Sequence, residues 1–426
     1  MINPVLIEHK SIRAAIFLLG AGLIGNTQAF GIGPKWEAVA PINTPRFQFA
    51  AGATDNNIYI FGGNGPNESN LKSLEALDLN DPSTWSNLAD NNNNCFGGST
   101  CVDGGGVEEV TGAGLNGKFY VFGGYGGGNP YGVFNFVQEY DPASDTWSSK
   151  ASMPTVRSAA ISVAYENEIY LFGGDYFHPV TNKETNYKIV EAYNPDTDTW
   201  RKVPGMTLPQ LRQAFSVAVV NDKAYIIGGG LQSTMKANNN VSAYDFKSQI
   251  WIKTGLTALP TPRVFTYGHA APVLNGKIYL IGGAIPTKKP SPHLIGSTKV
   301  EIYDPLSNTW QIGPALPQTS LFGAAVVANE AIYVISGTLE DNDTSAVNNV
   351  WKLDDAWKSE LAVDETCDLN ADGKFSSVDA TLFTNACKND TAYWECDLNA
   401  DGQFTAKDTA AYKLQWKKAK TACPTG

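Results

Sequence analysis

A segment that recurs through residues 35–360 constrains the fold more than any other feature of this sequence. In five copies an apolar, β-rich run ends in a glycine pair, and a sixth copy keeps only the second glycine. The copies end at Gly62-Gly63, Gly123-Gly124, Gly173-Gly174, Gly228-Gly229, Gly282-Gly283 and Ser336-Gly337, with 50 to 61 residues between successive copies. A period of this length predicts one supersecondary unit per copy, stacked against its neighbours.

Each copy continues into a second strand and ends in a tryptophan. Four copies place a tyrosine seven residues before it: Tyr140–Trp147, Tyr193–Trp200, Tyr244–Trp251 and Tyr303–Trp310. The unit resembles the kelch repeat, in which an apolar strand is followed by Gly-Gly, Tyr and Trp. The resemblance implies that residues 30–361 form an all-β, six-bladed propeller with four antiparallel strands, a to d, in each blade. The aromatic side chains are then expected to fill the gaps between blades.

Two tryptophans compete to close the expected ring. Trp36 leads into a Pro41–Arg46 segment like those that follow other d strands, so the N-terminal strand is expected to complete the last blade. Trp357 is the alternative, and the sequence leaves this choice open.

One apparent nucleotide-binding signature is set aside. Residues 112–117 fit G-x-G-x-x-G, but no strand-then-helix pattern surrounds them. Asn116-Gly117 and Asn275-Gly276 occupy the same place in two copies, which predicts two-residue hairpin turns between strands a and b.

Charge and the first residues narrow the class of protein. A net charge of −11 argues against a nucleic-acid partner, because phosphate binding needs clustered Lys and Arg. Lys10 and Arg13 precede an apolar run at residues 14–25, and Thr27-Gln28-Ala29 follows with small residues. This pattern predicts an export signal over residues 1–29. The run is too short to cross a bilayer, so we expect a secreted, extracellular or periplasmic protein without a membrane span.

The long connections predict where a ligand binds. Strands alternate in direction, so the b–c and d–a loops share one face, and the length is concentrated there. Two groups on these loops are candidate ligand-binding residues: the aromatic pair Tyr176 and His178, and the arginines Arg46, Arg157, Arg212 and Arg263. Each arginine follows a proline and opens strand a. We expect them either to bind an acidic ligand at the inner rim or to donate to backbone carbonyls of neighbouring blades.

The C-terminal region carries two copies of Asp-Leu-Asn-Ala-Asp-Gly-x-Phe, 29 residues apart. Both match an EF-hand-type loop whose last ligand is Asp, and calcium prefers such oxygen ligands. The first loop offers Asp368, Asn370, Asp372, Lys374 and Asp379, and the second offers Asp397, Asn399, Asp401, Gln403 and Asp408. Lys374 and Gln403 contribute backbone carbonyls. The sequence therefore predicts two bound calcium ions.

Two such loops at the end of an exported chain resemble a dockerin, here over residues 362–426. That family binds cohesins, which makes a cohesin-like partner an expectation. The chain departs from the family at Ser377-Val378 and Ala406-Lys407, where a matched hydroxyl pair is usual. Two packed loop–helix units would pair Cys367 with Cys423 and Cys387 with Cys396, and Cys95 would pair with Cys101. The alternative, a zinc site, is disfavoured because the sequence has no Cys-x-x-Cys pair.

Three functions remain open. The leading hypothesis is a secreted calcium-binding protein whose propeller binds a glycan or an extracellular protein, and whose C-terminal module docks it or stabilises the chain end. The alternative is a carbohydrate-active enzyme, because six-bladed kelch propellers include sialic acid mutarotases and dockerins accompany polysaccharide-degrading enzymes. Asp103, Asp175 and Glu184 lie in long loops and would supply acid–base chemistry if they converged. The third is a structural scaffold.

Overall fold

A computed structural model describes part of the second of two compact units, Pro34–Gly426. The described residues are 36–66, 69–90, 106–126, 132–178, 180–181, 183–231, 236–264, 270–286, 294–339 and 346–354. They form β-strands and turns, and no α-helix occurs among them. Within this part of the chain, no helix is long and apolar enough to cross a membrane.

The described residues contain six four-stranded antiparallel sheets. The first three sheets, each given from strand a to strand d, are β2 (Ala50–Ala53), β3 (Asn57–Phe61), β4 (Leu74–Asp78) and β5 (Trp85–Asn87); β7 (Thr111–Leu115), β8 (Lys118–Phe122), β11 (Val137–Asp141) and β12 (Thr146–Ser149); and β13 (Ile161–Tyr165), β14 (Glu168–Phe172), β17 (Val190–Asn194) and β18 (Thr199–Lys202). We refer to them as blades one to three.

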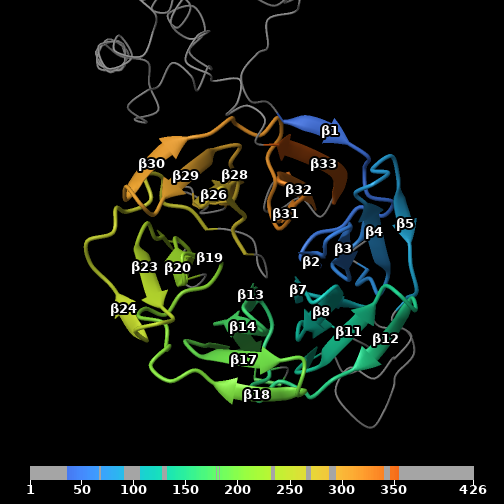
Figure 1. The fold of residues 1–426 in the computed structure, drawn as a ribbon, viewed down its shortest axis with the longest axis horizontal. Helices are drawn as coiled ribbons and strands as arrows, with labels where there is room; N and C mark the ends of the chain where they lie inside the picture. Colours follow the sequence, from blue (N-terminus) through green and yellow to red (C-terminus); the bar gives the residue numbers. More distant parts are fainter. Residues whose placement is uncertain are drawn as a thin grey trace, which may run out of the picture. The chain divides into compact units, whose positions relative to one another are not determined.

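Blades four to six continue the pattern along the chain. Their strands are β19 (Ser216–Val220), β20 (Lys223–Ile227), β23 (Val241–Asp245) and β24 (Ile250–Ile252); β25 (Val273–Leu274), β26 (Lys277–Ile281), β29 (Val300–Asp304) and β30 (Thr309–Ile312); and β31 (Ala324–Ala328), β32 (Ala331–Gly337), β33 (Val347–Asp354) and β1 (Glu37–Val39). The a strands face the centre of the ring and the d strands form its outer edge (Figure 1). This architecture confirms the all-β propeller part of the predicted fold class, and the predicted C-terminal module lies outside the described residues.

The ring closes through the N-terminal strand. Strand β1 pairs antiparallel with β33, with Ala38 opposite Trp351, and so supplies strand d of blade six. The Trp36 indole donates from Nε1 to the carbonyl of Pro314 in the preceding connection at 2.8 Å. The Trp36 alternative is therefore the one observed, and Trp357 lies outside the described residues.

The glycine and turn predictions hold in the backbone geometry. Gly62 and Gly63 have φ of 68° and 91°, and the other glycine pairs repeat these left-handed values, which side chains disfavour. Asn116-Gly117 joins β7 to β8 with φ of 52° and 74°, as a type I′ hairpin turn requires. The G-x-G-x-x-G segment thus forms a hairpin, not a dinucleotide site.

The spacing of tyrosine and tryptophan follows from strand pairing. Tyr140 lies opposite Trp147, and Tyr193 lies opposite Trp200, because each pair spans the short turn between strands c and d. Across the blade interface, Tyr59 contacts Tyr140 with ring centroids 5.6 Å apart, and Phe61 contacts Trp147 at 4.9 Å. These rings fill the gaps between adjacent blades, as predicted.

Each tryptophan also ties its blade to the preceding connection. Trp147 Nε1 donates to Ala89 O at 2.8 Å, and Trp200 Nε1 donates to Ala151 O at 2.8 Å. Trp36, Trp85, Trp251 and Trp310 make the equivalent bond. A buried indole N–H needs an acceptor, so this bond fixes where each d–a connection crosses to the next blade.

Short ribbons extend the b–c loops beyond the blades. They are β6 (Val107–Glu108) with β9 (Tyr125–Gly126) and β10 (Gly132–Val133), β15 (Asp175–Phe177) with β16 (Glu184–Asn186), β21 (Gly230–Leu231) with β22 (Lys236–Ala237), and β27 (Ala284–Pro286) with β28 (Leu294–Gly296). Because b–c and d–a connections share one face, these ribbons rise on the face predicted to bind ligand.

Candidate functional site

The four arginines predicted to line the rim are buried. Arg46, Arg157, Arg212 and Arg263 expose at most 2% of their surface. Three of them meet a glutamate, the second residue of strand c in their own blade: Arg46 with Glu75, Arg157 with Glu191, and Arg263 with Glu301, at 2.5 to 2.7 Å. Burial lowers the pKa of these three arginines, and the glutamate charge partly offsets the change.

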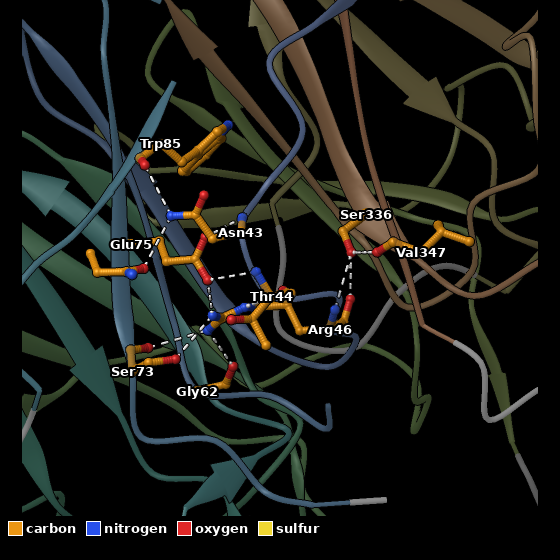
Figure 2. A network of polar contacts seen from close by, with 10 residues as sticks. Asn43, Thr44, Arg46, Gly62, Ser73, Glu75, Trp85, Ser336 and Val347 are labelled. Atoms are coloured by element: carbon orange, nitrogen blue, oxygen red, sulfur yellow. Dashed lines mark hydrogen bonds and ion pairs between the residues drawn. The ribbon is translucent and has the colours of Figure 1, made fainter. Parts of the chain in front are cut away.

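Arg46 shows what the pairs do (Figure 2). Its Nη1 donates to the carbonyl of Gly62 at 2.9 Å, and its Nη2 donates to Glu75 Oε1 at 2.5 Å. Glu75 in turn accepts from the backbone N–H groups of Asn43 and Thr44. The pair therefore fastens the d–a connection to strands b and c.

This geometry corrects the prediction of an arginine ring that holds an acidic ligand. Three guanidinium groups are already neutralised inside the protein, and their donors point at carboxylates and backbone carbonyls. We assign Arg46, Arg157 and Arg263 to the framework, which is the other role expected for them. Arg212 lacks a carboxylate partner among the described residues and is considered separately below.

A different set of residues lies where the d–a connections reach the innermost strands. In every blade one residue of this connection pairs with the start of the b–c loop, and it differs from blade to blade: Phe47, Glu108, Ser158, Gln213, Val264 and Leu321. This residue bridges to the residue that follows the glycine pair of its blade, as Ser158 does to Asp175. The residue after it has positive φ in each described copy: Gln48, Glu109, Ala159, Ala214 and Phe322. We call these residues and their bridge partners the mouth.

One side of the mouth gathers carboxyl groups. Asp175, only 8% exposed, accepts hydrogen bonds from Ser158 Oγ at 2.8 Å and from Gln213 Nε2 at 2.9 Å. The same Gln213 amide also donates to Glu184 Oε1 across the β15–β16 ribbon. Glu109 reaches this group from blade two: its carbonyl accepts from the backbone N–H of Ala159 at 2.9 Å, and the charges of Asp175 and Glu184 act on its carboxyl group. Asp175 and Glu184 therefore converge, while Asp103 lies outside the described residues.

Crowding changes the acidity of this group. Burial, and then the charge of Asp175, raise the pKa of Glu109 from 4.5 to about 8. Burial also raises the pKa of Asp175, although Gln213 and Ser158 donate to it. At neutral pH the cluster therefore combines a protonated carboxyl group with acceptor oxygens.

The opposite side of the mouth is apolar. Phe47 of blade one and Phe322 of blade six lie with ring centroids 6.4 Å apart, tilted by 43°. The backbone N–H of Gln48 donates to the carbonyl of Phe322 at 2.8 Å, so the two blades join at this point. Val264 and Leu321 extend the apolar side. A site with carboxyl oxygens on one side and aromatic rings on the other suits a ligand with a polyhydroxylated ring.

Tyr176 and His178 lie on the β15–β16 ribbon beside the carboxyl group. Their rings meet edge to face with centroids 6.1 Å apart. His178 Nδ1 accepts from the backbone N–H groups of Val180 and Thr181, so it holds the turn of the ribbon. Both side chains are partly exposed on the loop-rich face, where their predicted ligand role stays a prediction.

Several predictions fall outside the described residues. They include both calcium loops, from Asp368 to Asp379 and from Asp397 to Asp408, as well as all six cysteines and the export signal. Among the residues that the structure does describe, no cluster of His, Cys, Asp or Glu has an arrangement that holds a metal ion.

The sequence reasoning missed Glu109, Ser158 and Gln213. Their signal lies in the repeat itself: when the copies are aligned on the position that holds the arginine in four of them, the next residue differs in every copy. Residues that vary within an otherwise regular repeat mark positions that the fold leaves unconstrained.

Comparison with known proteins shows which family of propellers this chain belongs to. The sequence matches the Attractin/LZTR1 beta-propeller family over residues 32–288 and again over residues 150–357. The chain belongs to this family. Beta-scruin of Limulus polyphemus is 26% identical over 53% of this chain, and Kelch-like protein 36 of Bos taurus is 28% identical over 49% of it. The aligned regions cover 24% and 32% of those two proteins.

The fold comparison agrees with this family. The solved structure of YjhT aligns with a TM-score of 0.60 over 73% of this chain and 95% of YjhT, at 18% identity. The propeller is therefore of kelch type. The mouth, rather than the shared fold, must decide what this member does.

Proposed function

We propose that this chain is a secreted, calcium-binding kelch propeller whose mouth binds a glycan. The observation that carries the proposal is the convergence of Glu109, Asp175 and Glu184, with Ser158 and Gln213, at the inner end of the loop-rich face. Three blades contribute to this group, so no single repeat could build it. The group therefore forms only when these blades are packed side by side in the ring.

The chemistry of the mouth favours a sugar. Carboxylate oxygens accept hydrogen bonds from hydroxyl groups, and a protonated Glu109 adds a donor among them. Phe47 and Phe322 offer aromatic surface for the less polar side of a sugar ring. The alternative ligand, an extracellular protein, would also be expected to contact Tyr176 and His178 on the raised ribbon.

The experiment is a glycan-array screen of the mature chain, repeated with Glu184→Gln. The proposal predicts binding to a defined class of glycan and a signal at least tenfold lower for the variant, because Gln replaces two strong acceptors with one weaker acceptor. If the wild-type chain binds no glycan but captures an extracellular protein through the Tyr176 ribbon, the glycan proposal is wrong.

A second function has one observation in its favour. The pKa of Glu109, near 8, lets it donate a proton at neutral pH, and a neighbouring carboxylate could accept one. Such a pair suits sugar mutarotation: the acid protonates the ring oxygen, the base removes the anomeric hydroxyl proton, and the ring C–O bond breaks to open the sugar. Exchange spectroscopy on a free reducing sugar tests this directly, with Glu109→Gln as the inactive control.

The calcium part of the proposal rests on the duplicated loops of residues 368–379 and 397–408. Isothermal titration should find two calcium ions per chain. Asp372→Ala with Asp401→Ala should abolish both sites, since each substitution removes one carboxylate ligand from its loop. Uptake of no calcium by the wild-type chain would contradict this part and leave the mouth unaffected.

A further inference from the structure

Blade four departs from a polar arrangement that blades one, three and five share. In blades three and five a threonine two residues before the arginine donates to the paired glutamate: Thr155 Oγ1 to Glu191 at 2.9 Å, and Thr261 Oγ1 to Glu301 at 2.9 Å. Blade one keeps the same residues, Thr44, Arg46 and Glu75. In blade four the arginine remains, but Gln210 replaces the threonine and Ser242 replaces the glutamate.

Arg212 nevertheless lies as its counterparts do. Its Nη1 donates to the carbonyls of Gly228 at 3.1 Å and Asn240 at 3.5 Å. Arg46 makes the equivalent bonds to Gly62 and Ser73. The guanidinium is therefore held in the same position in both blades. What differs is the place beside it, which a glutamate carboxylate occupies in the other blades.

Some polar groups around that place have no partner among the described residues. Ser242 Oγ makes no hydrogen bond to any described residue, although Ser242 is only 5% exposed. Arg212, 2% exposed, likewise leaves Nε without a partner among them, as Arg157 does in blade three, so Ser242 is what sets blade four apart. Arg212 Nη2 meets a neutral amide oxygen, Gln210 Oε1, at 3.1 Å. Burial lowers the pKa of Arg212 to about 10, and no carboxylate among the described residues offsets it. A buried cation without a counter-ion is costly.

The segment of sequence around Arg212 does not supply the missing charge. Residues 199–300 contain twelve Lys and Arg but only two acidic residues, Asp222 and Asp245, in a protein whose net charge is −11. Those two are paired with Lys247 and Lys223 at the turns on the other face of the blade. This count includes the parts of the segment that the structure does not describe, so none of them provides a carboxylate. The local excess of positive charge favours an anion from solvent.

We propose that blade four binds a small monovalent anion between Arg212 and Ser242, in the place that glutamate fills in blades one, three and five. A glutamate side chain exceeds a serine side chain by about the size of a formate ion, so the site takes formate or chloride. Arg212 and the Ser242 hydroxyl donate to the anion. Gln210 and Asn240 are exposed, and they mark the side from which it enters.

The test compares anions on the full-length protein. Thermal unfolding is followed while chloride or formate replaces gluconate, which is too large for the site, at constant ionic strength. The wild-type Tm should rise saturably by about 2–4 °C with the small anions. Ser242→Glu should remove this response and raise the Tm in gluconate, because it restores the internal carboxylate.

A matched variant in blade three tests the converse. Glu191→Ser reproduces the blade-four arrangement beside Arg157, so it should unfold at lower temperature in gluconate and recover partly in formate or chloride. A crystal soaked in bromide should show anomalous scattering within hydrogen-bonding distance of Arg212. An unchanged anion response in Ser242→Glu, or a wild-type Tm that is equal in all three anions, would overturn the proposal.

Discussion

The gaps between blades and the mouth are built from equivalent positions of the same repeat, yet they behave in opposite ways. Between blades the same residue types return: a tryptophan that donates to the preceding connection, a tyrosine opposite it, and an arginine paired with a glutamate. At the mouth the bridging residue, such as Phe47 in blade one and Ser158 in blade three, differs in every blade. Repetition identifies what holds the ring together, and variation identifies where this chain is specialised.

The largest effect should come from breaking a framework ion pair. Glu191→Ala leaves the buried Arg157 without its carboxylate and should lower the free energy of unfolding by about 3–5 kcal/mol. The control is Arg201→Ala, which breaks an ion pair with Glu168 in which Arg201 is 45% exposed, and should cost about 0.2–1 kcal/mol. Equal losses in urea unfolding would contradict the distinction between these two positions.

The mouth should make the stability of the folded protein depend on pH. The pKa of Glu109 is about 8 in the folded protein and near 4.5 when exposed, so the folded state holds a proton that the unfolded state has released between these values. Stability should therefore fall as pH rises from about 4.5 to 8, by at most about 1.4 kcal/mol per pH unit from this group.

Glu109→Gln isolates that contribution, because the amide is of similar size and does not titrate. The slope of unfolding free energy against pH over this window should become shallower in the variant. Asp175, whose pKa is also raised, would supply the slope that remains. An identical slope in both proteins would show that Glu109 does not carry the proton.

A smaller effect tests the tyrosines of the framework. Tyr193 OH donates to Asp198 Oδ1 at 2.7 Å, and the same carboxylate accepts from the backbone of Ala151 in the preceding connection. Tyr193→Phe should cost about 1–2 kcal/mol in urea unfolding. Tyr244, which donates to the carbonyl of Pro204 at 3.1 Å, provides the matched control, and Tyr244→Phe should cost about 1 kcal/mol or less.

The sequence predicted the repeated framework of the blades well and the variable mouth poorly. The glycine pairs and the seven-residue spacing from tyrosine to tryptophan predicted the blades, because backbone geometry and strand pairing dictate both. The site could not be predicted in the same way. Asp175 and Glu184 were visible as loop carboxylates, but their meeting with Glu109 depends on how blades two and three are placed.

The arginines show how a recurring residue can be mistaken for a binding residue. Their regular recurrence suggested a ring of charge at the rim, yet recurrence is what a framework residue shows. The paired glutamates also recur, as the second residue of strand c in blades one, three and five, and this pairing is readable once the copies are aligned. The exception in blade four, Ser242, becomes informative only against that background.

The most direct test of the account is to measure the affinity of the glycan found on the array for three proteins by calorimetry: wild type, Asp175→Asn and Arg201→Ala. Asp175 accepts two hydrogen bonds at the mouth, whereas Arg201 lies on strand d at the outer edge. We predict that Asp175→Asn stays folded and loses at least tenfold in affinity, while Arg201→Ala binds as the wild type does. Wild-type affinity in a folded Asp175→Asn would contradict the assignment of the ligand site to the mouth.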